Sequence, residues 1–130
     1  MVLPKFVDFE IVTICGSMRF YNTMLEVAQS LSLAGVIVLM PFCNMKEPMY
    51  EGMGAEKIML DKMHFAKIDL SHGIYVVNGD SITLASGPDA RNRAYIGEST
   101  TREITYARHH AKYIRYYIQP LEEQYRVDTH

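Results

Sequence analysis

Three short apolar runs, each followed by a segment of different periodicity, constrain this chain more than any other feature. They are residues 10–15 (EIVTIC), 36–40 (VIVLM) and 74–77 (IYVV). The second run has no polar face, which is typical of a parallel strand covered by helices on both sides. Glycine or proline follows the first two runs. Each run therefore predicts a short buried strand.

The segments between these runs have the spacing of amphipathic helices. Residues 21–34 predict a first helix, and Gly35 stands where a C-terminal cap belongs. Its apolar face consists of Met24, Val27, Ala28 and Leu31. Residues 55–71 predict a second helix, with an inward stripe of Met59, Met63, Ala66 and Leu70. A third helix is expected to begin near Ser99, and residues 113–118 predict a last strand.

Strand alternating with helix predicts an α/β fold with a parallel sheet. Right-handed crossovers permit the order 2-1-3-4, a small doubly wound sheet of the flavodoxin or Rossmann type with helices on both faces. In such sheets the ligand crevice lies at the carboxyl ends of the strands, where the chain reverses its direction of travel. The loops expected at this point are residues 16–20 and 78–101.

Length and charge limit the function classes. A chain of 130 residues is expected to form a single domain, with a core at about 10–118 and a polar tail at 119–130. A net charge of −2 gives no pull toward polymeric nucleic acid or acidic membranes. No apolar run has membrane-spanning length, and the N-terminus does not read as a signal peptide, so a cytoplasmic location is expected. Cys15 and Cys43 match no metal or redox spacing, and we expect neither metal nor cofactor.

The stretch GESTTREITYA, residues 97–107, contains the strongest candidate site. Gly97 permits a close backbone approach, and hydroxyl residues including Ser99 and Thr100 follow at a predicted helix N-terminus, which is a ready anion site. Glu103 comes one turn later, where its carboxylate would face a bound anion. In the alternative interpretation, Thr100 and Glu103 only form a capping box.

Two further segments are expected to reach the same crevice. Arg19 follows the turn Gly16–Ser17–Met18 at a strand end, where it would grip a phosphate or carboxylate, unless it is a solvated surface residue. On the second helix, Asp61 and His64 lie three residues apart and would serve as proton donor or hydroxyl anchor. The alternative there is a solvated face with a Lys57–Asp61 pair worth only about 0.2–0.5 kcal/mol.

The segment 78–96 is long for a loop in so small a domain and has little periodicity. Such loops are usually functional or mobile. We therefore predict a lid that becomes protected from hydrogen exchange when a ligand binds.

Three motifs in this order resemble the nucleoside 2-deoxyribosyltransferase superfamily, which includes the 2′-deoxynucleoside 5′-monophosphate N-glycosidases. They are CGSMR at residues 15–19, an apolar strand that ends at Asn78, and EITYA at 103–107 followed by KYI at 112–114. The likeness spans roughly residues 11–117. The chain departs from the pattern where the family has an aspartate on the second helix, because the aligned positions are His64 and Phe65. Ser99 and Thr101 stand where glycines normally precede the nucleophile.

The resemblance implies that Glu103 is the nucleophile, that the turn containing Ser17 and Arg19 binds sugar or phosphate, and that Ser99 holds a 5′-phosphate. The resemblance and the predicted topology together give four catalytic candidates: Glu103, His64, Asp61 and Glu98. The expected substrate-binding residues are Gly16, Ser17, Met18, Arg19, Asn78, Gly97, Ser99 and Thr100.

The expected chemistry is cleavage or transfer at the N-glycosidic bond of a nucleoside or its monophosphate. This bond breaks through an oxocarbenium-like state that a carboxylate stabilises or traps, while Glu98 or His64 supplies a proton. The expected partners are the small-molecule nucleoside or nucleotide and further copies of the chain in a homo-oligomer. The alternative is a nucleotide-sensing module of the same fold without turnover. A phosphoribohydrolase of the cytokinin-activating type is disfavoured, because its PGGxGTxxE loop has no match here.

Overall fold

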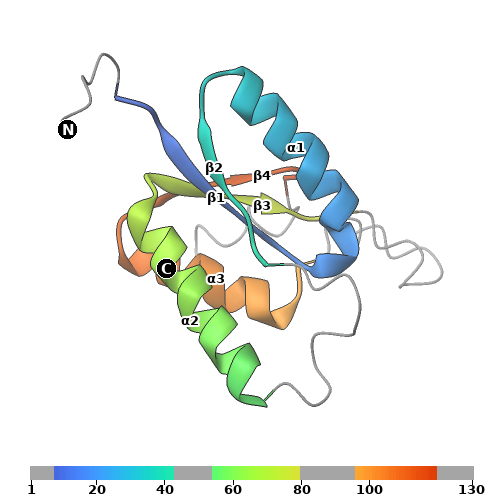
Figure 1. The fold of residues 1–130 in the computed structure, drawn as a ribbon, viewed down its shortest axis with the longest axis vertical. Coiled ribbons are helices and arrows are strands. Elements are labelled where there is room, and N and C mark those ends of the chain that lie inside the picture. Colours follow the sequence, from blue (N-terminus) through green and yellow to red (C-terminus); the bar gives the residue numbers. More distant parts are fainter. Residues whose placement is uncertain (1–7, 43–53, 80–95, 120–130) are drawn as a thin grey trace.

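Four parallel strands form one sheet in the order β2-β1-β3-β4 (Figure 1). The computed structural model describes residues 8–42, 54–79 and 96–119. The strands are β1 (Ile11–Gly16), β2 (Ile37–Leu39), β3 (Gly73–Val77) and β4 (Tyr113–Tyr116). This order confirms the predicted doubly wound α/β topology. Within the described residues, no helix has the length and apolar character needed to cross a membrane.

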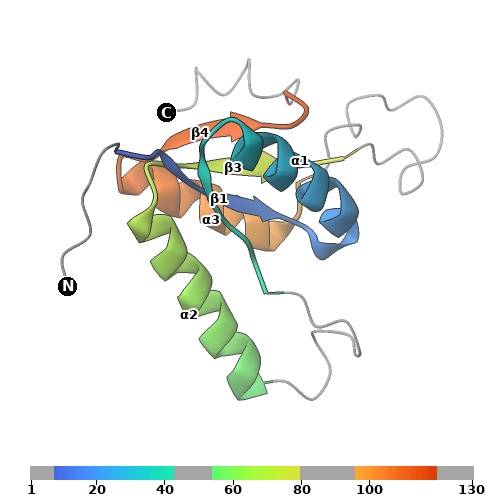
Figure 2. The same cartoon turned by 45° about the horizontal axis from the view of Figure 1, so that its top comes forward.

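Helices cover both faces of the sheet, as Figure 2 shows. One face carries α1 (Tyr21–Leu33), which is preceded by a single 3-10 turn, η1 (Met18–Phe20). The other face carries α2 (Gly54–Leu70) and α3 (Glu98–His109). Because successive side chains of a strand point to opposite faces, adjacent residues enter different layers. Ile14 and Val77 pack with α1, whereas Cys15 and Val76 pack with α2 and α3.

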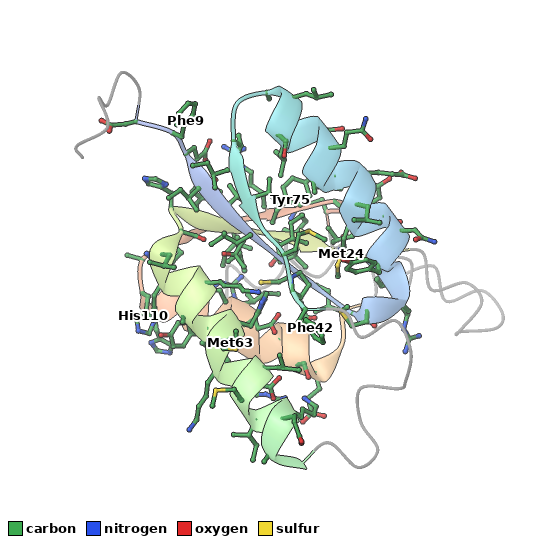
Figure 3. The ribbon with its side chains drawn as sticks, in the orientation of Figure 1. Phe9, Met24, Phe42, Met63, Tyr75 and His110 are labelled. Atoms are coloured by element: carbon green, nitrogen blue, oxygen red, sulfur yellow. The ribbon has the colours of Figure 1, made fainter. Side chains whose placement is uncertain are left out.

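The predictions for α1 are confirmed. Met24 and Val27 are buried, and Met24 lies in one apolar cluster with Tyr75 of β3 (Figure 3). The cluster also takes in Ala28 and Leu31. Gly35 follows the helix with a φ of 88°, a left-handed conformation that glycine adopts without strain. The N–H of Gly35 donates to the carbonyl oxygen of Ser32, which closes the helix end.

The inward stripe predicted for α2 is wrong. Met59, Met63 and Leu70 are 58%, 47% and 69% exposed, whereas His64 and Ile68 are buried. The N-terminal half of α2 extends beyond the sheet (Figure 2), so Ile58 and Met59 have no sheet to cover them. The inner face is rotated by about one residue from the most apolar face. This rotation turns His64 inward.

Candidate functional site

A pocket of about 390 Å³ opens beside the carboxyl end of β1. This volume is in the range typical of small-molecule sites, about 300–1,000 Å³. The loop after β1, the inner face of α2 and the first turns of α3 all contribute to its wall. The predicted site residues that line it are Gly16, Ser17, Met18, Arg19, Asp61, His64, Gly97, Glu98, Ser99, Thr100 and Glu103. The doubly wound topology therefore gathers three segments that are far apart in the sequence.

The first wall of the pocket is the turn after β1. A Cβ atom on Gly16 would lie 2.4 Å from the carbonyl oxygen of Val77, so no larger residue fits there without a shift of the backbone. The Ser17 hydroxyl accepts from the backbone N–H of Arg19 at 3.4 Å and from its Nε at 3.2 Å. These bonds hold the base of the exposed Arg19 side chain at the rim of the pocket.

The second wall is the N-terminus of α3. The helix begins at Glu98 with Gly97 as its N-cap, so Thr100 is its third residue and Glu103 its sixth. This register rules out the predicted capping box, which needs Thr100 at the N-cap. The first N–H groups of a helix have no intrahelical acceptor, and Gly97 to Thr100 line the pocket. The N-terminus of α3 therefore faces the pocket with the free donors that bind anions.

The floor of the pocket contains the Glu103 carboxyl group. Its side chain is 17% exposed, and Oε1 is buried with no hydrogen-bond partner in the part of the chain that the structure describes. Burial raises the pKa of Glu103 from 4.5 to about 7, against the lowering effect of the Cys15 thiol. The neighbouring Asp61 raises this pKa further. At neutral pH the group is thus divided between carboxylate and acid.

His64 lies beside Glu103, with 3.8 Å between its Nε2 and the Glu103 Oε1. Burial lowers the pKa of His64 to about 4, and the charge of Lys67 lowers it further. The distance alone would suit an ion pair, but burial disfavours the charge on both partners. His64 is therefore a neutral imidazole at pH 7.

Cys15 contacts the floor from behind, outside the residues that line the pocket, and sequence reasoning did not find it as a site residue. This residue is fully buried at the end of β1, and its Sγ lies 3.4 Å from the His64 Nε2. Burial raises the pKa of the Cys15 thiol well above 9.0, and the nearby Glu103 raises it further. Spacing along the chain carries no signal for this contact, since its partners come from two other elements. Strand alternation was the available signal, because Cys15 alternates with Ile14 on the opposite face.

Asp61 and Glu98 lie nearer the mouth of the pocket. Lys57 donates to Asp61 at 3.1 Å across one turn of α2, which confirms the i,i+4 pair considered above. Glu98 is 89% exposed and pairs with Arg102 at 3.3 Å. Arg102 also donates to the Ser99 hydroxyl. Both carboxylates thus have cationic partners and ready access to water.

Asn78 is the predicted site residue that does not line the pocket. Its Nδ2 donates to the carbonyl oxygen of Ile118 at 2.6 Å, and the N–H of Ile118 donates to its Oδ1 at 2.8 Å. Both ends of the amide therefore bond the backbone just beyond β4. The predicted lid, apart from its ends, lies outside the described residues, and so does the tail beyond residue 119.

Fold and pocket together define a class: a parallel α/β domain with a pocket at the switch point of its sheet. Comparison with protein-family models, curated proteins and solved structures found no match. The likeness to the nucleoside 2-deoxyribosyltransferase superfamily therefore rests on the three motifs.

Proposed function

We propose that this chain breaks the N-glycosidic bond of a deoxynucleoside, a nucleoside or a 5′-monophosphate, by hydrolysis or by transfer to a second base, with Glu103 as nucleophile. The observation that carries this proposal is the state of the Glu103 carboxyl group. It is mostly buried, faces a pocket of ligand size, and has an oxygen without a hydrogen-bond partner among the described residues. A carboxylate held only for stability would normally be paired.

In the proposed reaction, the Glu103 carboxylate attacks the anomeric carbon as the carbon–nitrogen bond breaks. The electron pair of that bond leaves with the base, and a glycosyl ester forms on the Glu103 carboxylate. Water or an incoming base then attacks the same carbon and releases Glu103, so the configuration is retained overall. Because Glu103 is largely buried, water screens its attraction to the developing cation only weakly.

The walls of the pocket support a monophosphate as the preferred substrate. The N-terminus of α3 presents backbone N–H groups and the positive end of a helix dipole, both of which favour an anion. Arg19 lies on the opposite loop, and a guanidinium binds phosphate through two parallel hydrogen bonds. The sugar would then lie between this anion site and Glu103, one turn farther along α3.

The proposed site has no strong candidate among the described residues of α2 for the group that protonates the departing base. Asp61 is the carboxyl group of α2 that lines the pocket, but it is half-exposed and paired with Lys57. His64 is neutral at pH 7, so it donates at most a hydrogen bond. This observation favours a second candidate function, a module that binds the nucleotide without turning it over.

The first test is incubation of the full chain with a panel of nucleosides, deoxynucleosides and their 5′-monophosphates. Free base is measured by chromatography and binding by calorimetry. Base release by the wild type supports an enzyme, and binding without release selects the sensor. A wild type that neither binds nor cleaves any member of the panel contradicts both candidates.

The Arg19→Ala variant tests the anion site in the same assays. We expect it to reduce the preference for monophosphate over nucleoside by about tenfold or more, because a charged hydrogen bond contributes about 1.5–3 kcal/mol. An unchanged preference would remove Arg19 from the phosphate site. A homo-oligomer and a cytoplasmic location remain further predictions.

A further inference from the structure

We propose that Cys15, His64 and Glu103 also form a binding site for a thiophilic divalent cation of the zinc class, next to the pocket that His64 and Glu103 line. The donor atoms are the Cys15 Sγ, the His64 Nε2 and the Glu103 Oε1. Binding of the cation does not depend on the function proposed above. The consequence of binding does depend on that function, because a cation on the Glu103 carboxylate would block the proposed nucleophile.

The geometry of the three donor atoms fits a small metal ion. Sγ and Nε2 are 3.4 Å apart, Nε2 and Oε1 are 3.8 Å apart, and all three atoms lie within 4.8 Å of one another. A tetrahedral zinc ion with bonds of about 2.0–2.3 Å places neighbouring ligand atoms about 3.3–3.6 Å apart. Two of the three separations are thus within a few tenths of an ångström of the required values. The third separation, between Sγ and Oε1, is at most 4.8 Å and therefore needs a movement of at most about 1.2 Å to reach this range.

The donor set suits zinc rather than magnesium or calcium. Thiolate and imidazole are preferred ligands of zinc, whereas the hard cations take oxygen. On binding, the S–H bond of Cys15 breaks, its proton leaves to solvent, and a metal–sulfur bond forms without any redox change. One thiolate and one carboxylate then balance the two positive charges, which a buried site requires. His64 and Glu103 also line the pocket, which leaves a fourth position open to water or a ligand.

The Glu103 Oε1, unpaired within the described part of the chain, provides a second observation. His64 is 7% exposed and Cys15 is fully buried, yet the Glu103 Oε1 and the His64 Nδ1 have no hydrogen-bond partner among residues 8–42, 54–79 and 96–119. Buried polar atoms are normally paired. A cation bound by Nε2 and Oε1 gives the carboxylate oxygen its missing partner and leaves the ring proton on Nδ1.

Three cationic side chains whose charges act on His64 or Glu103 are directed elsewhere, and one of them, Arg102, pairs with Glu98 at 3.3 Å. The Lys67 Nζ donates to the carbonyl oxygen of Met40 at 2.6 Å. The Lys57 Nζ donates to Asp61 at 3.1 Å. Neither ammonium group is hydrogen-bonded to the three donor atoms in these contacts, so neither takes the place of the metal.

Titration of the full chain with Co²⁺, followed by absorption spectroscopy, tests the site directly. We expect a sulfur-to-cobalt charge-transfer band, intense visible bands of tetrahedral Co²⁺, and loss of both when Zn²⁺ is added. Spectra typical of octahedral Co²⁺ without the sulfur band, or no binding at all, would overturn the proposal.

Variants identify the ligands. Cys15→Ser should abolish the charge-transfer band, while Cys43→Ser, which removes the other thiol of the chain, should keep it. His64→Gln and Glu103→Gln should each weaken Co²⁺ binding by at least about 100-fold, because loss of even an outer-shell partner weakens binding about 10–100-fold. Loss of the band in Cys43→Ser, or its retention in Cys15→Ser, would overturn the assignment. If Cys15→Ser does not fold by circular dichroism, the other two variants decide.

Zinc inhibition separates this proposal from the proposed function. If the wild type releases base, Zn²⁺ should stop the release over the same concentrations at which it displaces Co²⁺, and a chelator should restore it. Base release at full Zn²⁺ occupancy would contradict the proposed block of Glu103 while leaving the binding site intact. If the wild type releases no base but shows the cobalt spectrum, the function fails and the metal site stands.

Discussion

The two faces of the sheet are built from the same strands but bury different chemistry. On the α1 face, the buried cluster is Ile14, Met24, Val27 and Val77, all apolar. On the face of α2 and α3, the layer that contains Cys15 and Ile104 also buries His64 and most of Glu103. Burial of apolar area stabilises the first face. The second face also buries an apolar cluster, and in addition it holds polar groups away from water, which shifts their pKa values and prepares them for chemistry.

The polar groups buried on the second face include residues below the pocket. Ser71 on the α2 side is buried and shares hydrogen bonds with Thr13 of β1 and the carbonyl oxygen of Lys67. These contacts satisfy the polar atoms below the pocket. The buried atoms without a hydrogen-bond partner among the described residues lie closer to the pocket, on His64 and Glu103. The lower part of this layer is therefore structural, and the upper part is available to a ligand.

The largest expected effect comes from Glu103→Gln, which removes the charge from the second face. If Glu103 is the nucleophile, base release should fall on the order of 10³-fold or more with little change in nucleotide affinity, because the charge acts mainly in the transition state. Steady-state kinetics and calorimetry measure the two quantities. Glu26→Gln, at an exposed carboxylate of α1 that does not line the pocket, is the matched control. Full activity of Glu103→Gln would remove Glu103 from its proposed role.

The next effect concerns the apolar face. Met24→Ala should lower the free energy of unfolding by about 2–5 kcal/mol, because it leaves a cavity between α1 and the sheet. Met59→Ala, the same substitution at an exposed position of α2, should change it by less than about 0.5 kcal/mol. Urea denaturation compares the two variants. Equal losses would mean that the outer face of α2 is buried in solution, as in an oligomer.

A pH series on chelator-treated protein would sharpen the contrast further. The pKa of His64 is lowered from 6.5 to about 4 on folding, so its contribution to stability is lost as the pH falls from 6.5 to 4. The pKa of Glu103 is raised from 4.5 to about 7, so its contribution is lost as the pH rises from 4.5 to 7. Over its pH range, each of these two pKa shifts changes the free energy of unfolding by roughly 3 kcal/mol.

Because these two dependences oppose each other, the wild type should show little slope from them between pH 4.5 and 6.5. His64→Gln should expose the Glu103 dependence, with stability falling as the pH rises. Glu103→Gln should expose the His64 dependence, with stability rising over the same range. Denaturant midpoints at several pH values measure both slopes. Parallel curves for both variants and the wild type would show that burial does not control these groups.

The smallest effect is expected for Asp61→Asn at the mouth of the pocket. It breaks the Lys57–Asp61 pair, which lies on an exposed helix face and should contribute only about 0.2–0.5 kcal/mol to stability. Urea midpoints are sufficient to detect so small a change if replicated. A large loss of base release with unchanged stability would identify Asp61 as the proton donor and would disfavour the sensor.

Strand alternation, helical spacing and turn residues already determined the layout of this chain. The runs EIVTIC, VIVLM and IYVV became β1, β2 and β3, and the order 2-1-3-4 followed from right-handed crossovers. Gly35 ended α1 as predicted. These features depend on local chemistry and on chirality, which act in the same way wherever the segment lies. For the same reason, the predicted strand order alone was sufficient to place the loop after β1 beside the start of α3.

Only the tertiary structure decided which face of α2 is buried and which residues lie next to Glu103. Periodicity favoured Met59 and Met63 as the inward residues, but the inner face belongs to His64 and Ile68, because part of α2 borders a pocket instead of an apolar layer. A capping box and a pocket carboxylate share the same sequence pattern, and the position of the N-cap at Gly97 separates them. The contact of Cys15 with His64 joins residues 49 positions apart, so it arises only when β1 and α2 pack, and no spacing along the chain encodes it.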